Sequence, residues 1–266
     1  MAYDRYPFPP EREIVVDAGY LGTGRHIIYA LVELDVTRAR ELLRAASEAE
    51  GRVLSFTAFL AASVAGAIAS HARVQAYRDW RGRLVVFHDV DVVVMVEPEP
   101  GAVAVPRIIR AANRKAVLEI SDEIRSFQGQ PQVKTRGRKL SSFAPHVPRF
   151  VRLGFFRLLK WNPHWFKRLS GTVIVTSVGM FGRGGGWGLG FLPLHTLGVL
   201  VGGIATKPAV HEGAIVIREF LNLTVSFDHD IVDGAPAARF VRSLADLIEG
   251  AAALEPEQIE QSSEAP

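Results

Sequence analysis

Residues 223–241 read LTVSFDHDIVDGAPAARFV, and the interpretation of the whole sequence depends on this stretch. Its apolar residues alternate up to Phe227, which predicts a strand that carries Asp228, His229 and Asp230 at its end. A helix is expected directly afterwards. Because a strand end and a helix start both hold a side chain rigidly, His229 stands where a reactive group would be well positioned.

His229 is the strongest candidate for chemistry in this stretch. A histidine titrates near neutral pH and can act as a general base. Asp233, four residues later, could orient the loop, and Gly234 permits a backbone conformation closed to other residues. The residue types leave alternatives open. A histidine beside aspartates is more often an ordinary surface residue, and Asp228, His229 and Asp233 could instead hold a metal, although no second histidine stands at ligand spacing.

Apolar periodicity predicts the remaining elements of one α+β domain, a mixed sheet covered by helices. Strands are expected over 27–36, 83–87, 90–96, 102–109, 171–177, 197–204 and 215–227. Helices are expected over 38–49 with Thr37 as N-cap, from Ser55 or Thr57 to about Ser70, over 116–126, and from Pro236 as a first helical position to just before Gly250.

Composition excludes several classes of protein. The chain has 266 residues, 48% of them hydrophobic, and no cysteine. Disulfide frameworks, thiolate zinc sites, iron–sulfur clusters and a cysteine nucleophile are therefore excluded. The polar, proline-rich N-terminus is unlike a secretory signal. The longest apolar run, 59–69, is too short to span a bilayer, so a soluble cytoplasmic protein is expected.

Charge is unevenly placed along the chain. The net charge is +3, yet residues 134–168 contain ten Lys or Arg and no Asp or Glu, which leaves 21 basic and 28 acidic residues elsewhere. A local basic segment on an acidic body predicts an anionic partner for that segment, not general nucleic-acid affinity.

The sequence HDIVDG at 229–234 resembles the His-x-x-x-Asp-Gly signature of chloramphenicol-acetyltransferase-like acyltransferases. The resemblance is greatest to the catalytic domain of the E2 subunits of 2-oxo acid dehydrogenase complexes. GTVIVTSVGMFG at 171–182 resembles that family's strand ending in a Gly-x-Phe-Gly turn. Residues 90–124 resemble its strand–strand–helix segment, and residues 26–37 resemble its first strand. The likeness covers about 200 residues in consistent order.

The resemblance implies an acyltransferase with a chloramphenicol-acetyltransferase-like fold. Its reaction would be base-catalysed acyl transfer between coenzyme A and a thiol resembling dihydrolipoamide, or another small acceptor. His229 would take the proton from the attacking thiol. A hydroxyl near the end of strand 171–177 would stabilise the tetrahedral oxyanion, typically by ~3 kcal/mol. Thr176 is favoured over its neighbour Ser177, and only one can serve because alternate residues of a strand face opposite ways.

The family also implies supporting residues, and here the sequence departs from its pattern. Asp233 would hold the histidine loop through an ion pair, and Gly234 would have a steric role. The Arg-containing helix that usually opens the domain is replaced by 11–25, which is predicted to be extended. Arg12 or Arg25 could pair with Asp233, although neither matches convincingly.

Two further segments differ from the family. The sequence LPLH at 192–195 stands where the family often has Asn-Pro-Pro-Gln, so the substrate channel is expected to differ. The glycine-rich stretch 182–190 lacks the lysine and spacing of a phosphate-binding loop and predicts a flexible turn near the site.

The domain boundaries follow from these comparisons with the family. We expect an N-terminal extension at 1–25, the catalytic domain at 26–254 with a basic aromatic insert at 149–168, and a polar tail at 255–266. The insert would be an interfacial helix on a membrane surface, a lid that attracts the phosphates of coenzyme A, or a subunit-packing helix with solvated arginines.

The resemblance also sets expectations for partners. A homotrimer with its site between subunits is the minimum assembly, and larger cages are possible in the family. No covalently bound cofactor is expected, and coenzyme A would be a substrate. With no lipoyl domain in the sequence, either a lipoyl protein would act in trans or the substrate would be a different thioester. The alternative function is a non-catalytic E2-like trimeric scaffold or a membrane-surface binding module.

Overall fold

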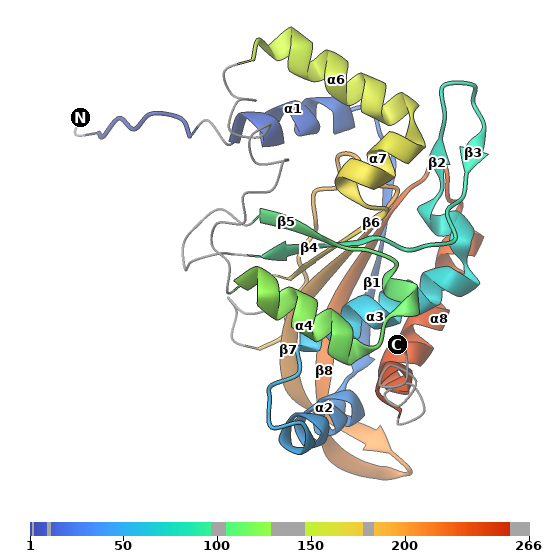
Figure 1. Ribbon diagram of the computed structural model, residues 1–266. Coiled ribbons are helices and arrows are strands. Elements are labelled where there is room, and N and C mark those ends of the chain that lie inside the picture. The colour runs from blue at the N-terminus through green and yellow to red at the C-terminus, as the bar shows by residue number, and fades with distance from the viewer. Residues whose placement is uncertain (2, 10–11, 97–104, 129–146, 178–183, 256–266) are drawn as a thin grey trace.

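A six-stranded mixed sheet forms the centre of the molecule (Figure 1). The computed structural model describes residues 1, 3–9, 12–96, 105–128, 147–177 and 184–255. The strand order is β1-β8-β7-β6-β4-β5, with β6 parallel to β4 and β7 and the other neighbours antiparallel. The strands are β1 (Ile27–Asp35), β4 (Val92–Val96), β5 (Val105–Ile109), β6 (Val173–Ser177), β7 (Leu197–His211) and β8 (Ala214–Asp228). A separate hairpin joins β2 (Tyr77–Arg78) and β3 (Leu84–Val85).

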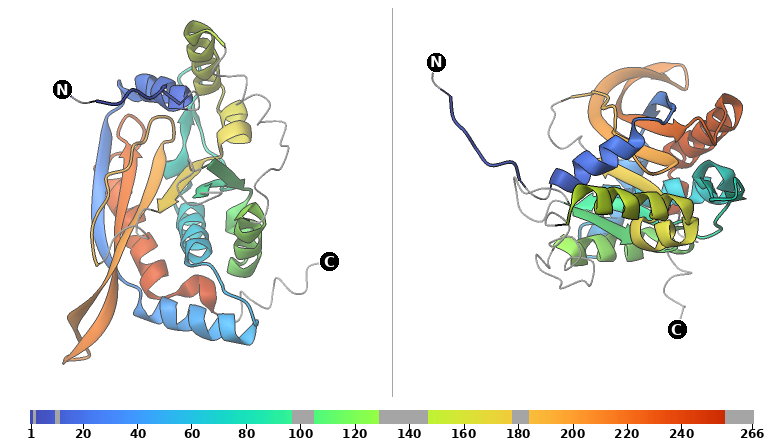
Figure 2. Two further views of the ribbon diagram at one scale, coloured as in Figure 1. Left: turned by 90° about the vertical axis from the view of Figure 1, so that its left-hand side faces the viewer. Right: turned by 90° about the horizontal axis from the view of Figure 1, so that it is seen from above.

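Helices cover one face of the sheet and enclose the hydrophobic core (Figure 2). The covering helices are α2 (Thr37–Ala49), α3 (Phe56–Ser70), α4 (Val117–Gln128) and α8 (Gly234–Glu249). Short 3₁₀ turns lie at Ala72–Gln75, Ala112–Arg114 and Ala252–Leu254. The middle helix α3 contacts both α4 and α8, and its many alanines allow the close approach. Phe240 of α8 meets Phe227 of β8 edge-to-face at 5.8 Å, so the helix after His229 is fixed directly to the strand before it.

On the opposite face of the sheet, chain without regular structure covers part of β7 and β8, while Tyr29 and Leu31 of β1 stay exposed. Segment 184–196 lies along β7, and the Gly203 N–H donates to the Gly186 carbonyl at 3.0 Å. A Cβ at Gly202 would lie 2.3 Å from the Gly186 oxygen, and one at Gly203 would lie 2.3 Å from the Gly184 oxygen. The close packing of segment and strand therefore depends on glycine at both positions. Of the glycine-rich stretch 182–190, residues 182 and 183 lie outside the described residues.

Three helices stand together beyond one end of the sheet (Figure 1): α1 (Arg12–Gly22), α6 (Arg149–Trp161) and α7 (Pro163–Ser170). Asp17 of α1 is fully buried and accepts hydrogen bonds from Arg149 Nε at 3.1 Å and Arg152 Nε at 2.6 Å. The prediction of extended chain over 11–25 was therefore wrong. The ion pairs that hold α1 come from a segment more than a hundred residues away, which local sequence could not reveal.

Most predicted strands and helices are confirmed, with corrections at their ends. Ser55 caps α3 as predicted, whereas Thr37 is the first residue of α2 and donates to Asp35 Oδ1 at 2.7 Å. Helix α8 begins at Gly234, so Pro236 is its third residue. The first four N–H groups of a helix have no partner within it, so the absence of an N–H on proline costs no hydrogen bond there.

The strands β7 and β8 extend beyond their predicted ends as a long hairpin that turns at Glu212–Gly213, where both residues have positive φ. The strand predicted over 83–87 is reduced to Leu84–Val85. Among the described helices none is both long and apolar enough to cross a membrane.

Candidate active site

A buried ion pair joins the segments around the end of β8. Arg25, two residues before β1, donates from Nε to Asp228 Oδ2 at 2.9 Å and also bonds the same oxygen through Nη2. Its Nη1 donates to the His195 carbonyl at 2.8 Å. Both charged side chains are buried. One guanidinium therefore fixes the start of β1, the end of β8 and the approach to β7.

A tight turn at residues 228–232 positions His229. Its backbone N–H donates to the His26 carbonyl at 2.7 Å, and the Ile231 and Val232 N–H groups both donate to the Asp228 carbonyl at 3.1 and 2.9 Å. The His229 side chain remains 43% exposed. The backbone around this histidine is therefore fixed, while its imidazole is open to a substrate or another chain.

Asp233 and Gly234 do not have the surroundings that the sequence predicted. Asp233 is 86% exposed, and its Oδ1 lies 3.8 Å from His229 Nδ1, beyond hydrogen-bond distance. Within the described residues its carboxylate pairs with no arginine, because Arg25 pairs with Asp228 instead. Gly234 does not have positive φ, and a Cβ there would meet nothing within 4 Å. In a single chain neither residue is required by the local geometry.

A second charged pair stands on the outer side of the turn. His26 Nδ1 lies 2.8 Å from Asp230 Oδ1. This hydrogen bond raises the pKa of His26 and lowers the pKa of Asp230. The pair links the residue before β1 to the residue after His229, so it reinforces the connection made by Arg25.

The candidate oxyanion donors lie at the far end of β6. Val173 and Val175 face the helical core, so Ser177 shares their side of the strand and Thr176 faces the opposite side. Thr176 pairs with Leu200, which pairs with Thr224 of β8. His229 lies five residues beyond Thr224, just after the end of β8. Strand residues are spaced by ~3.3 Å along the chain and neighbouring strands by ~4.8 Å. His229 and Thr176 are therefore separated by roughly 20 Å. One chain does not bring the two together.

The sequence analysis missed a row of buried polar residues on this face of β8. Asn222, Thr224, Ser226 and Asp228 alternate along the strand, and all four are buried. The Asn222 Oδ1 and Thr224 Oγ1 atoms have no hydrogen-bond partner among the described residues. Alternating polar residues usually indicate a side of the strand that faces solvent. No local feature of the sequence predicts that segment 184–196 covers this side of β8.

His195 is buried beside the same framework. Its Nε2 lies 2.8 Å from the Ser170 carbonyl, and its own carbonyl receives Arg25. Burial and, more weakly, the charge of Arg25 lower the pKa of His195 to about 4. The imidazole is therefore neutral near neutral pH and donates to Ser170 from Nε2. The LPLH stretch thus contributes a structural histidine to the site.

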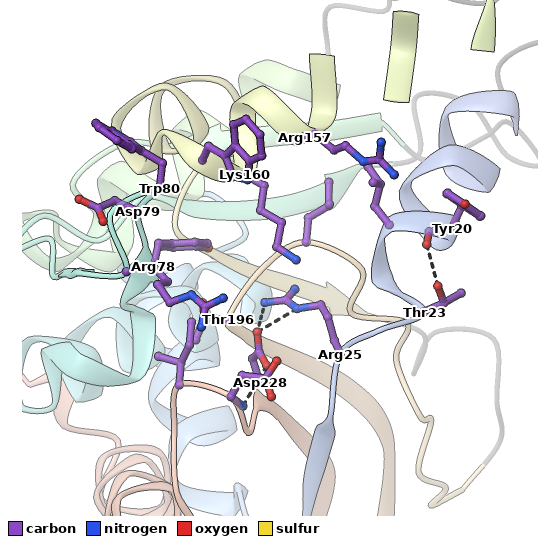
Figure 3. Close-up of a pocket in the computed structure, with 17 residues that line it drawn as sticks. Tyr20, Thr23, Arg25, Arg78, Asp79, Trp80, Arg157, Lys160, Thr196 and Asp228 are labelled. Carbon is purple, nitrogen blue, oxygen red and sulfur yellow. Dashed lines mark hydrogen bonds and ion pairs between the residues drawn. The ribbon is translucent and has the colours of Figure 1, made fainter. Parts of the chain in front are cut away.

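A cavity of about 700 Å³ opens beside this framework (Figure 3). The Arg25–Asp228 pair lies in its wall, together with Asp230 and Ile231 from the turn that carries His229. The other side is formed by α1, α6 and the β2–β3 hairpin. The lining residues are Tyr20, Leu21, Thr23, Arg25, Tyr77, Arg78, Asp79, Trp80, Gly82, Arg157, Lys160, Trp161, Leu194, Thr196, Asp228, Asp230 and Ile231.

The charges near the turn do not form a metal centre. In the ranges that the structure describes, no three or more His, Asp or Glu side chains are grouped so as to hold a metal ion. The Asp228 carboxylate, one of the three ligands considered from sequence, is bonded to Arg25.

Comparison with known proteins identifies the family. Residues 26–141 and 165–256 match the model of the 2-oxoacid dehydrogenases acyltransferase (catalytic domain). The chain belongs to this acyltransferase family. The resemblance inferred from HDIVDG and its context is confirmed. The ranges matched leave out residues 142–164, which include all of α6.

Individual relatives agree with this assignment. The dihydrolipoyllysine-residue acetyltransferase component of the pyruvate dehydrogenase complex of Staphylococcus epidermidis is 26% identical over 76% of this chain and 41% of its own length. The chain thus spans about two fifths of that relative. A probable dihydrolipoamide acetyltransferase from Listeria monocytogenes has a similar structure, with a TM-score of 0.72 and 20% identity over 94% of this chain and 96% of that one.

The fold prediction is confirmed as well. Chloramphenicol acetyltransferase superimposes with a TM-score of 0.54 and 13% identity, covering 93% of this chain and 99% of that chain. The acyltransferase family member described here therefore has the predicted α+β fold, a mixed sheet covered by helices.

The depressed pKa of His195 predicts a pH-dependent stability. Between pH 6.5 and about 4 the unfolded chain binds a proton at this residue that the folded chain does not. The free energy of unfolding should therefore fall as pH drops through this window, by up to ~3 kcal/mol. His195→Gln keeps a donor for Ser170 but does not titrate. Urea unfolding of both proteins at pH 7, 5.5 and 4.5 should give a shallower decline for the variant, and equal slopes would contradict the assignment.

Proposed function

We propose that this chain catalyses acyl transfer between coenzyme A and a thiol such as dihydrolipoamide. Membership of the acyltransferase family supports the reaction class. The observation that carries the mechanism is the placement of His229, whose backbone is fixed by the turn while its side chain stays 43% exposed. A dihydrolipoyl group or another small thiol would serve as the acceptor.

The reaction would proceed through a tetrahedral intermediate. A nitrogen of the His229 imidazole takes the proton from the attacking thiol, and the sulfur forms a bond to the thioester carbonyl carbon. A hydroxyl donates a hydrogen bond to the resulting oxyanion. When the intermediate collapses, the original carbon–sulfur bond breaks and the departing thiolate takes the proton back from His229. Thr176 remains the favoured donor, with Ser177 as the alternative.

The separation within one chain implies that two chains complete the site. His229 and Thr176 stand at opposite ends of the sheet, roughly 20 Å apart by the strand geometry. A hydrogen-bond donor must lie about 3 Å from the oxyanion that forms beside the base. We therefore infer a homotrimer in which His229 of one chain faces the hydroxyl of the next. That such trimers assemble further into a larger core stays a prediction.

Removal of either group should slow the reaction strongly. His229→Ala should lower kcat about 10²–10⁴-fold, the usual range for a general base. Thr176→Ala should lower it about 10²–10³-fold, and Ser177→Ala should have little effect. Thiol exchange between acetyl-coenzyme A and dihydrolipoamide measures all three. A larger loss of kcat in Ser177→Ala than in Thr176→Ala would make Ser177 the oxyanion donor. Full activity in His229→Ala would favour the non-catalytic scaffold.

Mixing the two inactive variants tests whether the site lies between chains. If each site uses His229 of one chain and Thr176 of the next, trimers reassembled from equal amounts of His229→Ala and Thr176→Ala should regain about a quarter of wild-type activity. Each variant reassembled alone provides the control. Activity that stays at the level of the separate variants, in samples shown to contain mixed trimers, would place the site within one chain.

A second candidate role concerns the outer surface of α6 and α7. Phe150, Phe155, Trp161 and Trp165 are large, exposed aromatic residues on a segment with cations and no acidic residue. Such a surface suits the headgroup region of an anionic bilayer, where aromatic rings and basic side chains bind together. This observation supports the membrane-surface module as an additional role of the insert.

Vesicle binding tests this second role. Phe155→Ser with Trp165→Ser removes apolar area outside the cavity and should reduce sedimentation with phosphatidylcholine vesicles containing 30% phosphatidylglycerol. Wild type should bind these vesicles and not pure phosphatidylcholine vesicles. Equal sedimentation of wild type and variant, or no binding of wild type to either vesicle, would contradict membrane attachment through this face.

A further inference from the structure

The cavity beside the His229 turn contains three cations that form no salt bridge within the described residues. Arg78, Arg157 and Lys160 line it, and none of them forms an ion pair with a carboxylate of the described chain. Figure 3 shows Lys160 reaching toward the Arg25–Asp228 pair, with Arg78 close beside that pair.

Each acidic residue of the lining already has a hydrogen-bonded basic or histidine partner. Asp79 binds Arg83 at 2.8 Å, and Asp230 binds His26 at 2.8 Å. Asp228 accepts from Arg25 at 2.9 Å. The cavity therefore offers an excess of positive charge. Arg78, Arg157 and Lys160 are exposed, and neighbouring cations repel one another, so an anion bound among them would be stabilised.

Two of these cations belong to the segment outside the family match. Arg157 and Lys160 are three residues apart on α6 and so lie on one helix face. Residues 142–164 lie outside the two ranges that match the family model. Arg78 lies inside the matched range, so the lining combines the matched domain with the unmatched segment.

Fixed contacts hold the α6 cations over the cavity. Asp17 binds Arg149 and Arg152 at the N-terminal part of α6. At the other end, the Trp80 N–H donates to the Trp161 carbonyl at 3.2 Å and joins the β2–β3 hairpin to the helix. Arg157 and Lys160 lie between these two attachments, so their backbone positions are set before any ligand binds.

We propose that this cavity is an anion-binding subsite, and that the acyl-transfer substrate places a phosphate or carboxylate group among Arg78, Arg157 and Lys160. The proposal rests on the proposed acyl transfer, because Asp230 and Ile231 in the cavity wall flank the turn that presents His229. The anion could be a phosphate of coenzyme A or a carboxylate on the acyl group. Both would receive charge-assisted hydrogen bonds from the same side chains.

Equilibrium binding of four stable ligands separates the two sources of negative charge. Coenzyme A and pantetheine share the thiol arm, and coenzyme A adds three phosphates together with an adenosine group. The thioethers S-(2-carboxyethyl)pantetheine and S-propylpantetheine differ in one carboxylate. Titration calorimetry on the assembled protein compares wild type, Arg157→Gln with Lys160→Gln, and Arg242→Gln. Arg242 is exposed on α8, so its variant is a matched control for loss of surface charge.

We expect the double variant to bind one anionic ligand at least about 10-fold more weakly, since it loses two charge-assisted contacts. Loss confined to coenzyme A identifies phosphate, and loss confined to the carboxyethyl ligand identifies carboxylate. The neutral partners and Arg242→Gln should stay within about twofold of wild type. The anionic preference of wild type should also shrink as salt is raised, because salt screens the contacts.

Two results would overturn the subsite. One is equal affinity of wild type and double variant for all four ligands. If the double variant then loses only vesicle binding, the cations serve a membrane surface instead. The other is an equal loss in Arg242→Gln, which would show a bulk charge effect. Binding needs no turnover, so an inactive wild type with intact anion binding would refute the acyl-transfer proposal alone. Normal turnover with no anion preference would refute the subsite alone.

Discussion

The Arg25–Asp228 ion pair is the interaction on which the arrangement of the site depends. Removing two charges from water is costly, and a buried pair repays this cost only where further hydrogen bonds complete it. Here Nη1 of Arg25 reaches the His195 carbonyl, while the Asp230 N–H donates to Asp228 Oδ1 at 3.2 Å. The pair therefore acts mainly to fix the relative positions of the segments it joins, and adds less to the free energy of unfolding. It sets the end of β8 against the start of β1, and the turn that carries His229 begins at the residue it holds.

Sheet topology then decides what a single chain can and cannot do. Because β7 runs antiparallel to β8 and parallel to β6, the end of β8 lies beside the beginnings of both β7 and β6. A base after β8 and a hydroxyl at the end of β6 must stand at opposite ends of the sheet, whatever their side chains do. The exposure of His229 agrees with this constraint, since a base completed by a neighbouring chain has to be open in the isolated one. The hydroxyl proposed as its partner, on Thr176, is half-buried on the face away from the helical core.

The parts predictable from sequence are those set by local patterns. The alternation in 215–227 and the His-x-x-x-Asp-Gly spacing lie within a single strand and turn, so β8, the following helix and the candidate base could be located in advance. Helix α1 could not, because the partners of Asp17 are Arg149 and Arg152, far along the chain. For the same reason the carboxylate that pairs with Arg25 could not be predicted: it is Asp228, and not Asp233, for which the family resemblance implied an ion pair. Which of two nearby carboxylates meets Arg25 depends on how three distant segments pack together.

The position of α6 follows from the same kind of polar contact, and this bears on what its cations do. An amphipathic helix normally docks through a broad apolar face, but α6 is attached to α1 by a carboxylate shielded from water, and Phe150 and Phe155 stay exposed. Charge pairs form only in a narrow range of geometries, so they fix the position of α6 relative to α1. Apolar contacts alone would let the helix shift along its neighbour. A segment needed only to cover surface would gain nothing from that precision. Arg157 and Lys160, placed on this fixed helix and left without carboxylates, gain from it if they meet an anion at a defined distance from the His229 turn.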